Sequence, residues 1–460
     1  MKDLRYILKP ESVVIVGVSK TAGKVGHIIL QNYINDGYSG RIYLVNKNAE
    51  EILGMKSYRR VTDIKEKGID LAVIAVPAEA VPQVLEDCGK AKVKSAVVVS
   101  GGFAEIGKTE LQDQITSIAK KYGIAMIGPN CLGVMDPRSR VNTLFLPSYK
   151  LSKPEIGGIS FVAQSGAVGS TVLDLMAGEG FGISKFISYG NAADIDEVDI
   201  LEYLMDDEET KVIAIYIEGI KRGKEFIELA KKITKKKPVV VLKAGRTAAG
   251  ATAAHSHTAA LAGSYEAHEA VFRQFGFTIA NDISELLYYS KIFASEGAPG
   301  GNRIAIITNG GGAGVLTTDA IASSRDMKIA ELSEKTKTAL RKVMPPLVNM
   351  RNPLDLAGDA DDKRYGAALE YLDADSQVDI MVVIILFQTP GADSRLAAQV
   401  ASMKEKTDKP MLVLSIGAEY TEMHKRMMER SGLPVYDSPR AVALSLEALY
   451  RYYQYRNRKA

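Results

Sequence analysis

Two histidines that stand one residue apart are the most reactive feature of this amino-acid sequence. His255 and His257 lie in AAHSHTAALAG at 253–263, after the apolar run PVVVL at 238–242. A β-branched apolar run that ends near a glycine predicts a strand, and the small residues that follow predict a loop. Imidazole combines a near-neutral pKa with a nucleophilic nitrogen, so it can act as a base, a metal ligand or a covalent carrier. On spacing alone, a surface loop with two incidental histidines explains the segment equally well.

A carboxylate and an anion-binding turn could complete the chemistry around such a histidine. Glu218 follows the apolar run at 212–217, and open α/β sheets bind ligands at the carboxyl ends of their strands. Ser165 and Gly166 lie between a predicted strand and a predicted helix, whose first amide groups favour anions. A carboxylate on one imidazole nitrogen leaves the other nucleophilic, and the amides stabilise a phosphoryl group. Phosphohistidine transfer fits all three features; an exposed loop carboxylate is the alternative for Glu218.

Two other chemistries fit these residues less well. The two histidines are separated by a single residue, no cysteine is near them, and no HExxH motif occurs, which disfavours a zinc site. A serine hydrolase would require glycines where Ala163 and Ala167 flank Ser165. We therefore expect no metal site in this chain.

The elements that must position these groups form three predicted α/β units. A length of 460 residues implies about three domains, and we predict them at 1–140, 150–296 and 301–460, with a linker at 138–157. Apolar strands that alternate with helices predict parallel sheets with right-handed crossovers. The predicted strands are 12–16, 41–45, 71–76 and 95–99 in the first unit, 184–188, 212–217 and 238–242 in the second, and 380–386 and 411–414 in the third.

The third unit resembles a diverged copy of the second. KPVVVLKAG at 237–245 is echoed by KPMLVLSIG at 409–417, and VIAIYIE at 212–218 by VVIILFQ at 382–388. Gln388 stands where the second unit has Glu218, and no histidine loop follows Gly417. The restriction of both features to one copy favours a functional over a purely structural role.

The first glycine-rich turn, GVSKTAGKVG at 17–26, is suited to a phosphate group. Its glycines and the following helix start allow backbone amides to approach an anion, although the pattern is not a clean GxGxxG. After the second strand, Asn46 and Lys47 stand where a site for NAD would have Asp or Glu. This favours a ligand with an extra ribose phosphate, coenzyme A or NADP, and a turn without any ligand is the alternative.

Composition excludes several classes of partner. The hydrophobic fraction is 46%, the charged fraction 25% and the net charge +3, which favours neither nucleic acid nor membrane surfaces. Cys88 and Cys131 lack metal-type spacing and indicate a reducing compartment. The N-terminal segment lacks the apolar core of a signal peptide, so we expect a cytoplasmic protein.

A series of short motifs covers essentially the whole chain: GVSKTAGKVG, GPNCLG, AQSGAVG, GNAADID, YIEG, SHTAALAG at 256–263 and TNGGGAG. In these motifs and their order the chain resembles the ADP-forming acyl-CoA synthetases, which belong to the superfamily of the succinyl-CoA synthetase α subunit. SHTAALAG is similar to the phosphohistidine loop of that family, commonly SHTGALAG, with Ala259 in place of a glycine. The resemblance implies an α/β protein, with an N-terminal Rossmann-like CoA-binding domain followed by two flavodoxin-like domains.

The resemblance also implies roles for individual residues. His257 would be the phosphorylated residue, because His255 lies outside the SHT motif, and Glu218 would orient it. Ser165 and Gly166 would bind the phosphate. The residues implied along coenzyme A are Gly17, Ser19, Gly23, Lys24, Gly26, Asn46, Lys47, Pro77, Ser100, Gly101, Gly102, Asn130 and Cys131.

The implied reaction converts acyl-CoA, phosphate and ADP into free acid, coenzyme A and ATP, through an acyl phosphate and a phosphohistidine on a mobile loop. We find no ATP-grasp module in the sequence. The resemblance therefore predicts the α subunit of an acetate–CoA ligase, with a separate ATP-grasp β subunit (an α2β2 assembly) that binds most of ADP and Mg²⁺. A non-catalytic CoA-binding regulatory protein is the main alternative. An NADP-linked oxidoreductase would leave the histidine loop and two domains unexplained.

Overall fold

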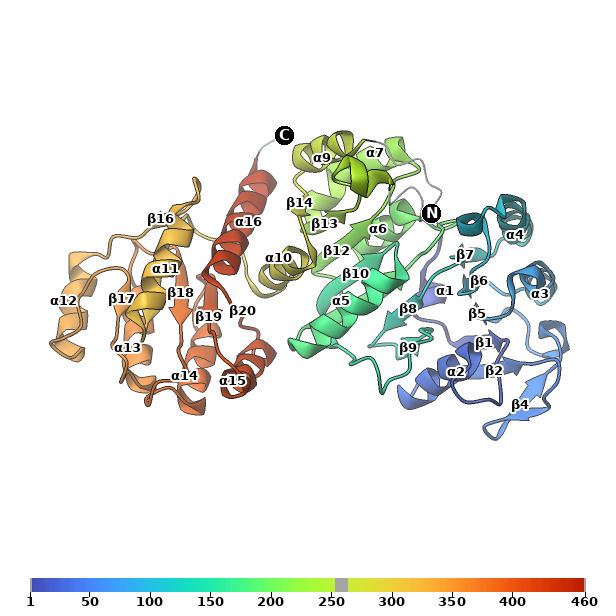
Figure 1. Cartoon of the computed structure of the whole chain (residues 1–460), viewed down its shortest axis with the longest axis horizontal. Coiled ribbons are helices and arrows are strands. Elements are labelled where there is room, and N and C mark those ends of the chain that lie inside the picture. The colour runs from blue at the N-terminus through green and yellow to red at the C-terminus, as the bar shows by residue number, and fades with distance from the viewer. Residues whose placement is uncertain (1, 253–263, 459–460) are drawn as a thin grey trace. The chain divides into compact units, whose positions relative to one another are not determined.

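The computed structural model describes residues 2–252 and 264–458, which fall into two compact units (Figure 1). The first unit contains the chain up to Gly178 together with Gly182–Ile283, and the second contains Glu179–Phe181 and the chain from Ser284 onward. Within these residues, no helix combines the length and the apolar composition that a membrane crossing requires. The predicted mixed α/β fold with parallel sheets is confirmed.

The first sheet has the strand order β3–β4–β2–β1–β5–β6–β7. Its strands are β1 (Ser12–Val16), β2 (Arg41–Val45), β3 (Glu51–Ile52), β4 (Met55–Tyr58), β5 (Leu71–Ile74), β6 (Ser95–Val98) and β7 (Ala125–Ile127). Only the pair β3–β4 is antiparallel among these neighbours. Without β3 the order is that of a dinucleotide-binding sheet, with the crevice at the switch point between β1 and β5. The predicted Rossmann-like domain is confirmed, and β5 and β6 end slightly earlier than predicted.

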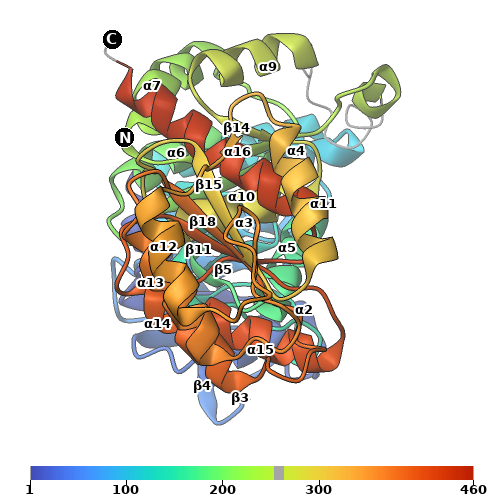
Figure 2. The ribbon, with the colours of Figure 1, turned by 90° about the vertical axis from the view of Figure 1, so that its left-hand side faces the viewer.

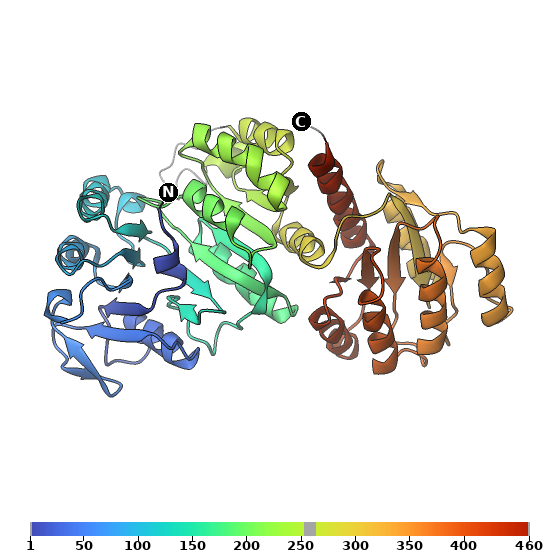
Figure 3. The same cartoon turned by 180° about the vertical axis from the view of Figure 1, so that it is seen from behind.

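Both faces of the first sheet are buried. Along β1, Val13 and Ile15 join one apolar cluster while Val14 and Val16 join another, as the alternation of a strand requires. The helices α3 (Val81–Lys90) and α4 (Thr109–Tyr122) pack side by side on the face of Val14 (Figure 3). The helices α1 (Arg5–Leu8) and α2 (Val25–Asn35) cover the other face. A parallel sheet covered on both faces explains why its strands consist of continuous apolar runs.

The second sheet has the order β14–β13–β12–β10–β11–β8–β9. Its strands are β8 (Gly133–Asp136), β9 (Val141–Asn142), β10 (Glu155–Ala163), β11 (Gly182–Ser188), β12 (Val212–Ile217), β13 (Val239–Lys243) and β14 (Thr278–Ala280). The parallel strands β10 to β14 have the flavodoxin-like order 2-1-3-4-5, with the switch point between β10 and β12. The helices of this part are α5 (Gly166–Gly178), α6 (Glu197–Asp206), α7 (Gly223–Lys236) and α9 (Tyr265–Gln274).

The chain enters the second sheet earlier than the sequence suggested. The strands β8 and β9 pair with β11 and with each other in antiparallel fashion, although 133–140 was predicted to close the first domain and 138–157 to be a linker. Val134 and Val141 belong to the same apolar cluster as strand residues of both sheets. The two sheets of the first unit therefore share a core, and β8 and β9 contribute to it.

The third sheet, in the second unit, has the order β16–β15–β18–β19–β20, with β17 paired to β15. Its strands are β15 (Arg303–Thr308), β16 (Lys328–Ile329), β17 (Leu354–Asp355), β18 (Ile380–Ile384), β19 (Met411–Leu414) and β20 (Val435–Tyr436). The helices are α10 (Ile283–Ser295), α11 (Gly311–Ala322), α12 (Glu334–Val343), α13 (Asp362–Asp373), α14 (Ser394–Lys404), α15 (Glu419–Arg430) and α16 (Pro439–Asn457). In Figure 2, α11 packs beside α16, and α13 packs beside α14. The flavodoxin-like order recurs, and β18 and β19 occupy the places of β12 and β13, which contain the echoed segments.

Candidate active site

The loops that follow β10 and β12 meet at the switch point of the second sheet. Gln164 follows β10, and its side-chain oxygen accepts hydrogen bonds from the backbone amides of Glu218 (2.7 Å) and Gly219 (3.2 Å). Gln164 and Glu218 are both buried. One side chain therefore fixes the Glu218 turn directly against the turn that begins α5.

Glu218 is buried, only 4% exposed. The Tyr216 hydroxyl donates a hydrogen bond to its Oε1 (3.4 Å), and the Lys243 ammonium donates to its backbone oxygen (2.8 Å). Burial raises the pKa of Tyr216, and the negative charge of Glu218 raises it further. Burial lowers the pKa of Lys243, and the same charge opposes that effect. The alternative of an exposed loop carboxylate is therefore wrong, because this carboxylate is buried and its charge affects the pKa values of Tyr216 and Lys243.

Ser165 and Gly166 form the start of α5. Ser165 is buried, and its hydroxyl oxygen accepts a hydrogen bond from the amide of Val168 (3.4 Å). Gly166 is the first residue of α5, where backbone amides lack partners within the helix. The helix N-terminus and the adjacent hydroxyl can therefore bind an anion next to the Glu218 turn.

A cavity of about 370 Å³ opens in front of this helix start. It is lined by segments of both sheets of the first unit. The lining residues are Val99, Asn130, Cys131, Leu132, Phe145, Leu146, Gln164, Ser165, Gly166, Ala167, Ser170, Gly190 and Asn191. The structure thus brings together Ser165 and Gly166 with Asn130 and Cys131, which the sequence assigned to different binding groups.

Cys131 is buried against the backbone in the wall of this cavity. Its Sγ donates to the carbonyl oxygen of Val98 (3.4 Å), and burial raises the pKa of the thiol to about 12. A thiol of that kind stays protonated at neutral pH and is a poor nucleophile. Asn130 adopts a left-handed conformation (φ 55°), and its side-chain amide donates to Asn191 Oδ1 (3.2 Å) at the cavity mouth. Asn130 thus presents a polar group to the cavity, whereas Cys131 only forms part of the cavity wall.

A polar cluster that the sequence did not reveal joins the two sheets at the cavity mouth. The side-chain amide of Asn191 donates to Glu105 (2.6 Å) and to Gln112 (3.0 Å), and Glu105 also accepts from the amides of Gly102 and Phe103. Burial acts to raise the pKa of Glu105, but the hydrogen bonds to its carboxylate lower it overall. Asn191 lies within the GNAADID motif, yet Glu105 is 86 residues away, and no local pattern links the two.

The glycine-rich turn at the first switch point is held by close backbone contacts. Gly17 has φ 91°, and a Cβ there would lie 2.3 Å from the carbonyl oxygen of Ala75, at the end of β5. A Cβ on Gly26 would lie 2.4 Å from the carbonyl oxygen of Gly17. The two glycines therefore let α2 begin directly against the end of β1, so the start of α2 lies at the crevice between β1 and β5.

The other residues assigned to coenzyme A lie along the same edge of the first sheet. The side-chain amide of Asn46 donates to the carbonyl oxygen of Val18 (2.6 Å) and thereby ties the turn to the end of β2. Ser19, through its carbonyl oxygen, lies 2.8 Å from the buried ring of His27. The Ser100 hydroxyl donates to the Val76 carbonyl oxygen (2.6 Å). The assigned residues that the structure leaves exposed at this edge are Gly23, Lys24, Lys47, Pro77 and Gly101.

His255 and His257 lie outside the described residues. The strand that precedes their segment is β13, which pairs with β12 so that Lys243 lies opposite Ile217. Glu218 directly follows β12 in the sequence. The strands β12 and β13 are therefore neighbours in the sheet, and Glu218 lies at the end of one of them.

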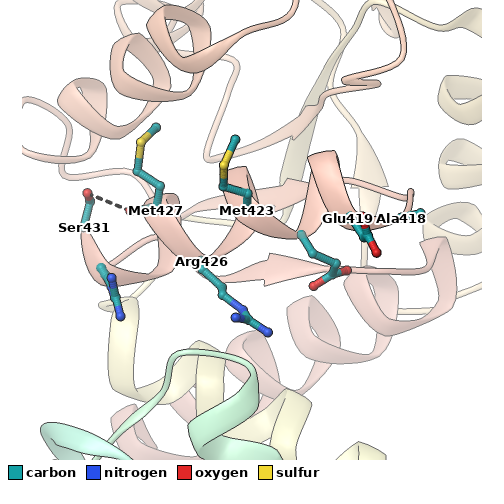
Figure 4. A pocket seen from close by; sticks show the side chains of 8 residues that line it. Ala418, Glu419, Met423, Arg426, Met427 and Ser431 are labelled. Carbon is teal, nitrogen blue, oxygen red and sulfur yellow. Dashed lines mark hydrogen bonds between the residues drawn. The ribbon is translucent and has the colours of Figure 1, made fainter.

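A second hollow follows α15 of the second unit (Figure 4). Met423, Arg426 and Met427 project from the helix, together with acidic side chains such as Glu419. Its lining comes from 418–431 alone, and none of the residues assigned from the sequence belongs to it. Active sites are typically built where polar groups from several elements converge, so we centre the functional site on the cavity at α5.

The chain matches models of three protein-domain families. A CoA binding domain matches residues 11–137, a succinyl-CoA ligase like flavodoxin domain matches residues 156–293, and a Ligase-CoA domain matches residues 304–457. These matches follow the order that the motifs implied.

Named relatives match nearly the full length of the chain. The chain is 40% identical to the acetate–CoA ligase (ADP-forming) II subunit alpha of Pyrococcus furiosus, over 97% of each chain. It is 42% identical to the acetate–CoA ligase (ADP-forming) of Methanocaldococcus jannaschii over 98% of its own length but only 63% of that relative. The dinucleotide forming acetyl-coenzyme A synthetase 1 of Ca. Korarchaeum cryptofilum, solved with phosphate and ADP, superposes with a TM-score of 0.92 and 35% identity, covering 99% of this chain and 98% of that one. These names favour a ligase over an oxidoreductase or a regulatory protein.

Proposed function

The chain belongs to the family of ADP-forming acetate–CoA ligases, and from that premise we propose that His257 carries the phosphoryl group between the acyl substrate and ADP. The protein is an acid–thiol ligase that interconverts acyl-CoA, phosphate and ADP with free acid, coenzyme A and ATP. One observation carries the residue assignment. Glu218 is buried at the end of β12, and the segment with His257 follows the adjacent strand β13.

In this proposal Glu218 orients His257. Its carboxylate accepts a hydrogen bond from one ring nitrogen, which leaves the other nitrogen free to attack phosphorus. A buried carboxylate also stabilises the positive charge that the ring gains during the transfer, because electrostatic interactions are stronger away from water. Gln164 holds the Glu218 turn in place through its two backbone hydrogen bonds.

The reaction proceeds in three transfers. A phosphate oxygen attacks the carbonyl carbon of the thioester, the C–S bond breaks, and coenzyme A leaves as a thiolate that takes up a proton. The ring nitrogen of His257 then attacks the phosphorus of the acyl phosphate, the P–O bond to the acyl group breaks, and the free acid leaves. Finally an ADP oxygen attacks the phosphohistidine, the P–N bond breaks, and ATP forms.

The start of α5 stabilises the phosphoryl group during these transfers. The amides of its first turn and the Ser165 hydroxyl face a charge that is spread over the phosphoryl oxygens in the transition state. Cys131 takes no covalent part, because its thiol is protonated and buried. The thioester lies at Asn130 in this scheme, since Asn130 lines the same cavity as Ser165.

The first switch point holds the rest of coenzyme A. The exposed Lys24 and Lys47 supply positive charge, and the start of α2 supplies amides, which fits a ligand with a diphosphate and a ribose phosphate. Bound in this way, coenzyme A supplies the thioester, and the residues of this edge only bind and orient it.

A partner completes the enzyme. The Pyrococcus relative is named as an alpha subunit, which implies a partner subunit in that protein. We propose a separate ATP-grasp β subunit that binds ADP and Mg²⁺, in an α2β2 assembly. Two free, buried cysteines support our expectation of a cytoplasmic location.

The proposed function is tested by ATP formation. The chain, purified with its ATP-grasp partner, should form ATP from ADP only when acetyl-CoA and phosphate are both present. ATP formation that does not require phosphate, or its absence with every acyl-CoA supplied, would contradict the proposal.

A further inference from the structure

The cavity at α5 has a mixed lining without charge. Asn130, Ser165 and Asn191 are among its polar residues, and Val99, Leu132, Phe145 and Leu146 are among its apolar residues. No charged side chain occurs among the described residues of the lining. An acyl group fits such a lining, because polar groups can bind its carbonyl oxygen and apolar side chains can pack on its hydrocarbon part.

The segment that carries Phe145 is fixed by buried hydrogen bonds. The side-chain amide of Asn32, which is 1% exposed on α2, donates to the carbonyl oxygens of Leu144 (2.7 Å) and Leu146 (3.1 Å). Thr143 is tied to β8 through its amide, which donates to Val134 (2.9 Å). Displacing a segment held in this way costs free energy, because the broken hydrogen bonds would leave buried groups unpaired.

Phe145 is the largest side chain of the cavity wall, and it is only partly buried. Leu132 and Val99 are buried in the core, so they are fixed by packing on their other sides. Phe145 and Leu146 are therefore the apolar lining residues that lie outside the fully buried core, although Phe145 packs against it.

We propose that Phe145, with Leu146 beside it, sets the largest acyl group that this enzyme accepts. The inference rests on the proposed function, because it takes the cavity to hold the acyl group of the thioester. We therefore expect the enzyme to accept uncharged acyl groups that are short enough to end at the phenyl ring of Phe145. Asn32 is a positioning residue in this account, because it acts through the backbone of the segment.

The test compares acyl-CoA thioesters of increasing chain length, with ATP formation by the complete enzyme as the readout. In Phe145→Ala, the ratio of kcat/KM for hexanoyl-CoA to that for acetyl-CoA should rise at least about 10-fold, the lower end of what a methylene in an apolar pocket discriminates. Leu146→Ala should shift it in the same direction. Leu175→Ala, the same truncation at an exposed position of α5, is the matched control and should leave the ratio unchanged.

Three outcomes are distinguishable. An unchanged ratio in Phe145→Ala and Leu146→Ala, with normal acetyl-CoA activity, would overturn the inference and leave the proposed function standing. If the wild type forms no ATP from any thioester, the proposed function itself fails. If Phe145→Ala does not fold, Phe145→Leu and Phe145→Trp replace it: the first should raise the ratio and the second should lower it, and an unchanged ratio in both would overturn the inference.

For Asn32, the readout must separate positioning from stability. Asn32→Ala should raise KM for acetyl-CoA and increase the relative activity with longer thioesters, because the wall loses its anchor. A lower unfolding free energy with an unchanged acyl preference would show that Asn32 only stabilises the fold and would remove it from the account.

Discussion

Replacing Gln164 tests the geometry of the active site at its most constrained point. Gln164→Met keeps the length of the side chain but removes the oxygen that accepts from the amides of Glu218 and Gly219. Because Gln164 is only 7% exposed, water does not readily replace that oxygen. An unpaired buried donor costs about 1–3 kcal/mol. We expect the loss of the two amide bonds, and of the long bond from the buried Tyr189 hydroxyl to the same oxygen (3.5 Å), to lower the unfolding free energy by about 2–4 kcal/mol after partial relaxation.

The same substitution should reduce the rate of catalysis. When the two hydrogen bonds are lost, the Glu218 turn is free to shift, and a misplacement of about 1 Å costs about 100-fold in rate. We therefore expect kcat for ATP formation to fall about 100-fold while the KM for ADP stays within a factor of two or so.

Urea unfolding and steady-state ATP formation measure the two effects. Gln114→Met, the same change at an exposed position of α4, is the matched control and should alter the unfolding free energy by less than about 0.5 kcal/mol. Gln164→Glu retains an acceptor oxygen but adds a charge next to Glu218, so its activity should fall relative to the wild type as the pH rises. Wild-type stability and kcat in Gln164→Met would refute the reasoning.

Three further predictions concern the first unit. Lys47→Ala should raise the KM for acetyl-CoA about 10-fold by removing an ionic contact with the ribose phosphate. The KM for the 3′-dephospho analogue of acetyl-CoA should not change, and an equal rise for both thioesters would exclude a phosphate contact. Cys131 should resist iodoacetamide at pH 7, since burial raises the pKa of its thiol to about 12, and rapid inactivation that Cys131→Ala abolishes would contradict this. The folded state lowers the pKa of Glu105, so its contribution to stability should be present above the unfolded pKa and be lost as the pH falls through the folded pKa. Between pH 7 and about pH 3, the free energy of unfolding in urea should accordingly decrease more for the wild type than for Glu105→Gln, and equal decreases would disprove the linkage.

Much of the fold could be predicted because its strands are continuous apolar runs. The strands at 12–16, 41–45, 212–217 and 411–414 coincide with β1, β2, β12 and β19. Such runs are encoded locally, since strands buried on both faces need apolar residues at every position. The short strands β8 and β9 at one end of the second sheet were missed, because they are defined by their antiparallel partners rather than by their own residues.

Residues of the site could be predicted only where they belong to a recognisable sequence motif. Strand ends and glycine turns identified Glu218, Ser165 and Gly17, because the position of a residue after a strand already determines which edge of the sheet it occupies. Local patterns could not reveal the burial of Glu218 or the contact between Glu105 and Asn191, which depend on residues distant in the sequence. The assignment of His257 is still a prediction, since its segment lies outside the described residues.

Phosphorylation of His257 is the central step of the proposed reaction. The complete enzyme, incubated with acetyl-CoA and radiolabelled phosphate without ADP, should acquire a label that is labile in acid and stable in base. Wild type and His255→Ala should carry the label, and His257→Ala should not. A label that persists in His257→Ala, or ATP formation by that variant at the wild-type rate, would contradict the account.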